Sequence, residues 1–289
     1  MTRQAPGPDL LLTLSCPDRP GIVHAVSGFV LRHGGNIVAS QQYGDSDNER
    51  FFMRLQFTPT AAAWSVGGLE ADFTAVGQEF AMDWQLTVAA TPARTLVLVS
   101  RLGHCLNDLL FRASTGTLPV VIPAVVSNHR DHEGLVRSFG IPFHHVPVTP
   151  ETRAGAEERL RELVADLGID LVVLARYMQV FSDDLCQQLA GRAINIHHSF
   201  LPSFKGARPY HQAHERGVKL IGATAHYVTA ALDEGPIIEQ DVVRADHWLG
   251  PSELAALGHD VEAQVLSRAV KWHAERRVLL NGARTVVFR

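Results

Sequence analysis

Three polar side chains in the second half of the chain are of the types that carry acyl-group chemistry. The apolar segment 193–197 is typical of a strand, and the alternation of side chains along a strand places Asn195 and His197 on one face. Asp233 follows a second predicted strand, in the glycine- and proline-containing turn 232–238. An amide, an imidazole and a carboxylate are therefore expected at neighbouring strand ends.

These side chains suit nucleophilic addition to an acyl carbon without a metal ion. An amide beside an imidazole can donate hydrogen bonds to an oxygen that gains negative charge, and one such donor is worth about 10²–10³ in rate. A nearby carboxylate can take a proton from the nucleophile or orient it, which contributes roughly 10²–10⁴. Taken singly, Asn195 could cap a loop, His197 could pack in the core and Asp233 could serve its turn. Their combined spacing favours catalysis.

The elements before residue 90 predict a small sheet with helices on one face, in the order βαββαβ. Pro20-Gly21 opens the first helix, and Gly34-Gly35 stops it because glycine is free to take positive φ. The predicted elements are strands 10–15, 37–43, 51–57 and 84–89, with helices that begin after Gly21 and at about residue 61.

Beyond the linker 91–94, buried parallel strands alternate with helices. Near-continuous apolar runs at 96–100, 120–126 and 171–175 are expected for strands covered on both faces. Helices are predicted at 106–113, 132–139, 151–167 and 252–276. The predicted fold class is therefore α/β, with a βαββαβ domain at 1–90 and a doubly wound, mostly parallel domain at 95–289. Such a sheet holds its ligand beyond the carboxyl ends of its strands.

Composition excludes several other classes of protein. The chain has 289 residues, 46% hydrophobic and 19% charged, and a net charge of -4 argues against nucleic-acid binding. No run approaches the roughly 18 apolar residues of a membrane span. The 3 cysteines form no CxxC pair, which favours a reducing, cytoplasmic location. The 15 histidines include no HExxH motif, so we predict no metal site.

The order of residues around the three side chains is similar to the active-site pattern of the folate-dependent formyltransferase family. The matching residues are Asn195, Ile196, His197, Leu201, Pro202, Gly206, Thr224, His226, Val228, Asp233, Gly235, Ile237 and Ile238. The resemblance spans roughly residues 94–289. It implies that Asn195, His197 and Asp233 are catalytic and that the substrate is a folate, with no cofactor. The expected substrate contacts are Arg176, Tyr177, Met178, His198, Thr229 and Gly235.

Three features resemble the formyltetrahydrofolate deformylases more than the transferases of this family. His198 follows His197 where the transferases usually have proline. The segment 100–105 lacks the glycine-rich stretch that would hold a nucleotide phosphate at a helix start. The first unit resembles an ACT domain in Pro17–Ile22 and Gly34–Ile37, a module that deformylases carry and purine transformylases do not. The resemblance implies hydrolysis of 10-formyltetrahydrofolate to tetrahydrofolate and formate.

The ACT resemblance implies regulation by an amino acid, with glycine and methionine as the expected effectors. We predict an effector site at Asp18, Arg19, Gly21 and Asn36, although the helix start and the glycines would also be needed for folding alone. Because ACT domains usually pair through sheet edges or helices, we expect a homo-oligomer, either a dimer or a tetramer.

Several alternatives stay open. A transferase could pass the formyl group to an amine, although the acidic balance disfavours a tRNA acceptor. A non-catalytic sensor of folate or amino acid could use the same folds, but it would have no need of Asn195, His197 and Asp233 together. Asp233 is either the base or a group that tunes His197. His198 is either a second polar wall near the water or a packing residue.

Overall fold

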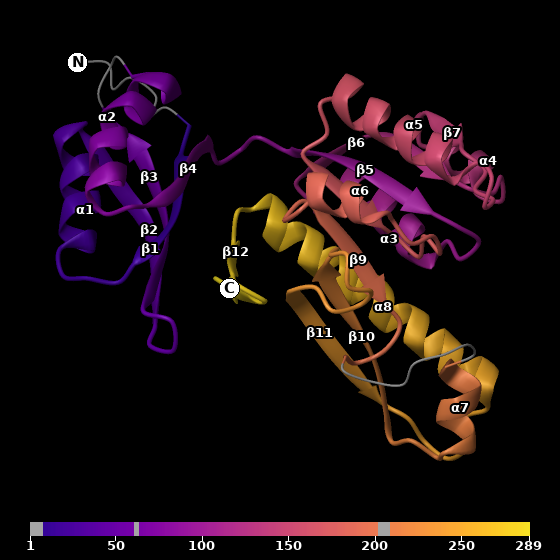
Figure 1. Cartoon of the computed structure of the whole chain (residues 1–289). Helices are drawn as coiled ribbons and strands as arrows, with labels where there is room; N and C mark the ends of the chain where they lie inside the picture. Colours follow the sequence, from indigo (N-terminus) through magenta and orange to yellow (C-terminus); the bar gives the residue numbers. More distant parts are fainter. Residues whose placement is uncertain (1–7, 61–63, 202–208) are drawn as a thin grey trace. The chain divides into compact units, whose positions relative to one another are not determined.

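The computed structural model describes residues 8–60, 64–201 and 209–289, which form two compact units (Figure 1). The first unit holds the described residues up to Thr91 together with Glu275–Asn281 and Val286–Arg289. The second holds the described residues of Pro92–Ala274 and Gly282–Thr285. The motif residues Pro202 and Gly206 and the start of the helix predicted from residue 61 lie outside the described residues.

The first unit is built on a four-stranded antiparallel sheet with the order β2-β3-β1-β4. Its strands are β1 (Leu10–Pro17), β2 (Gly35–Asp45), β3 (Arg50–Pro59) and β4 (Asp83–Val88). The central strand β1 pairs with β3 on one side and β4 on the other. This arrangement confirms the predicted βαββαβ order.

Two helices, α1 (Ile22–Arg32) and α2 (Val66–Glu79), cover one face of this sheet. Helix α1 begins directly after Gly21, whose φ of 101° lies in the left-handed region that favours glycine. The apolar sides of both helices join alternate residues of β1 and β3 in one core. Its largest fully buried members include Leu12, Phe29, Phe57 and Phe73.

The opposite face of the sheet is buried as well, although the sequence predicts helices on one face only. Leu11, Phe52 and Arg54 project to that face and are each at most 4% exposed. Arg54 Nη2 donates a hydrogen bond to the backbone oxygen of Glu275 at 3.1 Å. A buried guanidinium needs such a partner, since a buried charge without one is costly.

The end of the chain therefore packs with the first unit. Nδ2 of Asn281 donates to Oδ2 of the buried Asp45 at 2.6 Å. The hairpin of β12 (Val278–Asn281) and β13 (Arg284–Val287) lies in this tail. This grouping differs from the expected domain boundary, which placed all of 95–289 in the second unit. The difference arises because the polar groups on the sheet draw their hydrogen-bond partners from the tail.

A seven-stranded sheet with the order β11-β10-β9-β8-β5-β6-β7 forms the centre of the second unit. The five strands from β9 to β7 in this order are mutually parallel, whereas β10 runs antiparallel to both β9 and β11. The strands are β5 (Ala93–Val99), β6 (Val120–Ser127), β7 (Phe143–His145), β8 (Leu171–Leu174), β9 (Ala193–His197), β10 (Leu220–Tyr227) and β11 (Ile237–Arg244). The prediction of a mostly parallel α/β domain is confirmed.

The helices of the second unit include all four that the sequence predicts and two short ones that it does not. The predicted ones are α3 (His104–Ser114), α4 (Glu133–Ser138), α5 (Arg153–Asp166) and α8 (Pro251–Ala274). The additional ones are α6 (Asp183–Gln188) and α7 (Pro209–Glu215). The long helix α8 packs against β9, β10 and β11 and against α3. Within the described ranges, no helix combines the length and apolar character needed to span a bilayer.

Candidate active site

Strands β9 and β10 bring four polar side chains to one face of the sheet. In their antiparallel pairing, Asn195 lies opposite His226 and His197 lies opposite Thr224. Residues directly opposite each other in such a pair point to the same face. The shared face predicted for Asn195 and His197 is therefore present, and β10 adds the buried imidazole of His226 to it.

Asp233 enters this group from the loop between β10 and β11. Its φ of 58° is uncommon for a residue other than glycine, although aspartate tolerates it better than most. The loop is tight because Gly235 lies against the backbone of Tyr227. A Cβ atom at Gly235 would fall only 1.8 Å from the Tyr227 carbonyl oxygen. Gly235, an expected substrate contact, therefore serves to shape the turn that presents Asp233.

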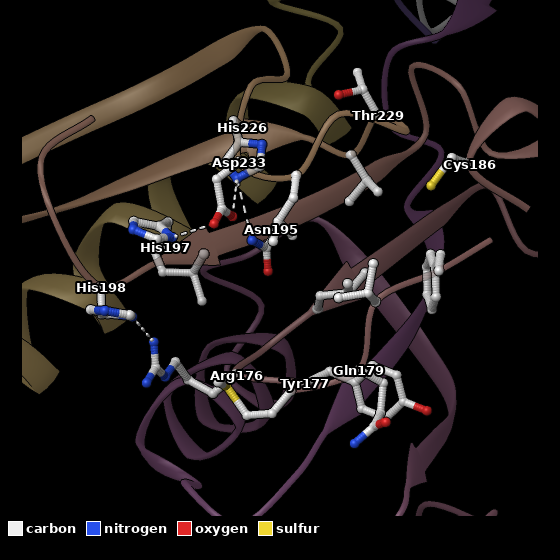
Figure 2. A pocket seen from close by; sticks show the side chains of 17 residues that line it. Arg176, Tyr177, Gln179, Cys186, Asn195, His197, His198, His226, Thr229 and Asp233 are labelled. Carbon is white, nitrogen blue, oxygen red and sulfur yellow. Dashed lines mark hydrogen bonds and ion pairs between the residues drawn. The ribbon is translucent and has the colours of Figure 1, made fainter. Parts of the chain in front are cut away.

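The Asp233 carboxylate bridges two histidines (Figure 2). Its Oδ2 lies 3.2 Å from Nδ1 of His197, and its Oδ1 lies 3.6 Å from Nε2 of His226. The hydrogen bond from His197, followed by that from His226, holds the pKa of Asp233 well below its usual range. Asp233 is therefore ionised at neutral pH. Because a carboxylate only accepts hydrogen bonds, Nδ1 of His197 carries the proton of their contact.

Asn195 is held by His226. Nδ2 of Asn195 lies 3.3 Å from Nε2 of His226, and Nδ1 of His226 donates to the Tyr227 carbonyl oxygen at 2.9 Å. Nε2 of His226 thus lies between the Asn195 amide and the Asp233 carboxylate. The amide nitrogen of Asn195 has two hydrogens and can donate to a ligand.

The sequence motif contains His226, but the residue pattern predicts no role for it. Strand alternation could have indicated such a role, because it places His226 on the same face as Thr224, two residues earlier.

A cavity of about 210 Å³ lies beside this cluster. Asn195, His197 and Asp233 all line it. Five expected substrate contacts line it too, namely Arg176, Tyr177, Met178, His198 and Thr229, whereas Gly235 does not. The remaining wall includes Leu174, Val180, Phe181, Val228 and Leu232. An apolar cavity with a few convergent polar groups is typical of a small-molecule site.

The loop after β8 carries Arg176 and Met178 to the cavity. Ser100, at the carboxyl end of β5, fixes this loop. Its Oγ accepts from Met178 N–H at 3.0 Å, and its own N–H donates to the Arg176 carbonyl oxygen at 3.2 Å. The φ of Arg176 is 63°, a backbone conformation that costs energy and is concentrated at ligand sites.

Behind the cavity, Glu262 of α8 is fully buried and held by three side chains. Nε2 of His104 lies 2.7 Å from its Oε2, the Tyr210 hydroxyl donates to its Oε1 at 2.8 Å, and Nε of Arg176 lies 3.4 Å from Oε2. Burial tends to raise the pKa of Glu262, but the His104 hydrogen bond and the Arg176 charge outweigh it and lower the pKa. Arg176 also reaches His198, with Nη1 3.0 Å from Nδ1.

Sequence reasoning missed this second cluster. Its members come from α3, α7, α8 and the loop after β8, so no local pattern links them.

The same cluster offers a possible set of metal ligands. Among the described residues, the ligand atoms of His104, His259 and Glu262 lie within 4.8 Å of one another. However, the positive charge of Arg176 already balances Glu262, and the rings of His104 and His259 are stacked at 4.1 Å. A divalent ion would add charge beside a guanidinium. The arrangement fits an ion-pair network better than a metal site.

In the first unit, the four residues of the expected effector site do not come together. Asp18, Arg19 and Gly21 lie in the turn between β1 and α1, where the Arg19 guanidinium lies 4.2 Å from the centre of the Phe80 ring. Asn36 lies at the start of β2, at the other end of the sheet, because α1 runs the length of the sheet between them. A site with all four residues would need two copies of the chain.

Two family models match separate parts of the chain. A model described as formyl transferase matches residues 93–270, and an ACT domain model matches residues 11–61. The solved structure of glycinamide ribonucleotide transformylase 1 from Symbiobacterium toebii is similar with a TM-score of 0.64 and 32% identity. It covers 71% of this chain and 98% of its own, so the likeness is limited to part of this chain.

Other relatives match across both units. A formyltetrahydrofolate deformylase from Corynebacterium sp. (strain P-1) is 54% identical over 279 residues, which are 96% of this chain and 98% of the relative. The chain belongs to the formyltetrahydrofolate deformylase family. A deformylase from Bacillus subtilis (strain 168) is 47% identical over 96% of this chain and 93% of its own length. The crystal structure of a deformylase from Burkholderia mallei is similar with a TM-score of 0.94 and 50% identity. The match covers 98% of this chain and 100% of that one.

Proposed function

We propose that this member of the deformylase family hydrolyses 10-formyltetrahydrofolate to tetrahydrofolate and formate. The observation that carries the proposal is the cluster of Asn195, His197, His226 and Asp233 on the wall of an otherwise largely apolar cavity. Relatives named for this activity match over nearly the whole chain. The cluster supplies an ionised carboxylate next to two groups that can donate to a developing oxyanion.

In the proposed reaction, the formyl group lies against Asn195 and His197. A water molecule oriented by Asp233 attacks the formyl carbon, and the resulting oxyanion accepts hydrogen bonds from Asn195 and His197. Because Nδ1 of His197 already donates to Asp233, its donor to the oxyanion is Nε2. The ring is then an imidazolium, whose charge the adjacent carboxylate stabilises. Asp233 therefore acts on both the water and His197.

Collapse of the tetrahedral intermediate completes the reaction. The bond from the formyl carbon to N10 breaks, its electron pair stays on N10, and N10 takes a proton. Water thus supplies a hydroxyl group to the carbon and a hydrogen to the nitrogen, and the acid product ionises to formate. No electron is transferred to or from an external group, so we propose a reaction without a cofactor. The apolar cavity walls, the loop of Arg176–Met178 and Thr229 would hold the folate ring.

The first unit supports a proposal for regulation. An amino acid, with glycine and methionine as the candidates, would bind at the turn of Asp18, Arg19 and Gly21, where two charged side chains adjoin a helix start. Asn36 would join this site only from another copy, which agrees with a dimeric or tetrameric assembly. A cytoplasmic location suits the three cysteines, which are all buried and free.

The test is to supply purified protein with 10-formyltetrahydrofolate and no amine acceptor. Stoichiometric release of formate and tetrahydrofolate over many turnovers is the expected result. A transferase would release no formate until an amine is supplied and would then form a formylated product. A sensor would bind the folate and leave it intact in both experiments.

A further inference from the structure

Arg176 joins the buried Glu262 to His198 on the cavity wall. A guanidinium has donors only, so the 3.0 Å contact from Nη1 to Nδ1 of His198 has a fixed direction. Nδ1 accepts and carries no proton. The single proton of the neutral His198 ring must therefore lie on Nε2. This contact defines a tautomer that a histidine ring alone would not reveal.

The position of Arg176 is fixed from two sides. Its carbonyl oxygen accepts from Ser100 N–H, and its Nε lies 3.4 Å from Oε2 of Glu262. Glu262 has no exposed surface and is itself held by His104 and Tyr210. A carboxylate buried to this extent is retained only with charged or hydrogen-bonded partners. The guanidinium thus has a fixed anchor on the side away from His198.

His198 is likewise held in place. Its ring stacks on that of His197, with centroids 4.6 Å apart and an interplanar angle of 23°. The backbone that follows is tied to β10, because Thr224 Oγ1 donates to the Ser199 carbonyl oxygen at 2.9 Å and accepts from Leu201 N–H at 3.1 Å. The imidazole therefore has little freedom to rotate away from Arg176.

Among the described residues, the charged and titratable groups that act on His198 are Arg176, His197, Glu262 and Asp233. Burial, followed by the charges of Arg176 and His197, lowers the pKa of His198 to about 4, against the weaker opposing effect of the two carboxylates. The ring is therefore neutral at physiological pH. A neutral ring whose Nδ1 is already occupied cannot act as a base toward substrate at Nδ1, and its Nε2–H can only donate.

We propose that His198 donates a hydrogen bond from Nε2 to the hydrolytic water, and that Arg176, anchored by Glu262, locks the ring in this tautomer. The inference rests on the proposed hydrolysis. An attacking water molecule uses one lone pair to bond to the formyl carbon and donates one hydrogen bond to Asp233. Its second lone pair can accept a hydrogen bond from Nε2 of His198. The His198 donor and the Asp233 acceptor together orient the water. Arg176 and Glu262 act on the water only through His198, so they are positioning residues.

The tautomer can be read directly by nuclear magnetic resonance on the full chain with ¹⁵N-labelled histidine. Comparison with His198→Gln assigns the His198 signals. We expect an unprotonated Nδ1 and a protonated Nε2 that do not change between about pH 8 and about pH 5.5. Protonation on Nδ1, or a doubly protonated ring at neutral pH, would overturn the proposal.

Two variants test whether Arg176, anchored by Glu262, fixes the tautomer of His198. In Arg176→Met, the His198 signals should shift to a mixture of tautomers and titrate closer to the ordinary histidine value of about 6.5. In Glu262→Gln, Arg176 loses its anchor and the tautomers should mix in the same way, although loss of this carboxylate does not itself raise the pKa of His198. Arg159→Met removes an exposed arginine paired with Glu162 on α5 and should leave the signals unchanged. Unchanged His198 signals in folded Arg176→Met would contradict the lock. If that protein does not fold, Glu262→Gln answers the same question.

Kinetic measurements distinguish hydrogen-bond donation by His198 from a role of its ring in packing alone. His198→Phe keeps a flat ring against His197 but has no donor, so kcat should fall about tenfold, the value of one hydrogen bond, with KM for the folate nearly unchanged. His198→Gln keeps a donor and should recover part of the loss. Equal kcat for wild type and His198→Phe would remove His198 from the mechanism. Absence of formate release from the wild type would instead refute the proposed function and leave the tautomer measurement valid.

Discussion

His197 presents Nδ1 to Oδ2 of Asp233 at 3.2 Å, and this contact determines what each group can do. The carboxylate stays ionised because two imidazoles surround it. His197, in turn, can donate to substrate only through Nε2. The pair therefore places negative charge beside the ring that must become positive during the reaction.

Asp233→Asn should abolish hydrolysis while folding and folate binding survive. The amide cannot take a proton from water or stabilise the His197 imidazolium, so kcat should fall about 10²–10⁴-fold. Formate release gives the rate, and calorimetric titration with tetrahydrofolate gives the binding. Asp246→Asn, which changes an exposed aspartate in the loop before α8, is the matched control. Wild-type turnover in Asp233→Asn would remove this residue from the mechanism.

Asp233 should also make stability depend on pH. Its carboxyl pKa is lower in the folded than in the unfolded chain, so its stabilisation is complete above the unfolded value of about 3.9 and is lost as the pH falls toward the folded value. Scanning calorimetry should find wild type more stable than Asp233→Asn by a constant margin from about pH 8 to about pH 5. The margin should shrink below about pH 4. A stability margin that widens on acidification would contradict a lowered pKa of Asp233 in the folded chain.

Gly235→Ala should damage the site through the backbone. The added methyl group would meet the Tyr227 carbonyl oxygen, so the loop must shift, at a cost of about 1–3 kcal/mol. The shift would also move Asp233, and kcat should fall. Gly134→Ala in α4, where a Cβ meets nothing within 4 Å, is the control and should be neutral or slightly stabilising. Thermal unfolding and formate release of both variants measure the two effects. Unaltered stability in Gly235→Ala would contradict this close approach.

Asn281→Ala should destabilise the first unit although it changes the last part of the chain. Asp45 is buried and loses the hydrogen bond from Asn281 Nδ2, which costs about 1–3 kcal/mol. Asn36→Ala, at an exposed asparagine of the same unit, should have little effect. Hydrogen exchange of β1 and β3 amides compares the two variants. Equal exchange rates in both would mean that the tail contributes nothing to the stability of the sheet.

Much of the fold was predictable because strong periodicity reflects burial. The runs at 96–100 and 171–175 have no polar face, and β5 and β8 are indeed buried between helices. The elements without such a pattern escaped prediction. β7 has three residues and α6 six, so each is too short to show a period. The grouping of Glu275–Asn281 and Val286–Arg289 with the first unit could not be predicted, because the sequence of a short hairpin carries no information on its packing partner.

For the site, alternation along β9 was enough to place Asn195 and His197 together. It could not reveal the hydrogen bond from His226 to the Tyr227 backbone, which depends on the turn that follows. Glu262 was unpredictable for a different reason. A glutamate on a long helix normally points to solvent, and only the convergence of His104, Tyr210 and Arg176 accounts for its burial.

The return of the chain to its first unit has a consequence for synthesis on the ribosome. The strands of the first sheet emerge early, but the residues that bond to Arg54 and Asp45 lie 221 and 236 positions later in the sequence. The part of the second unit between Pro92 and Ala274 must leave the exit tunnel before the sheet receives these partners. An interrupted translation product therefore has an incomplete first unit, however well its own strands have formed, and it should be recognised by proteases more readily than the finished protein.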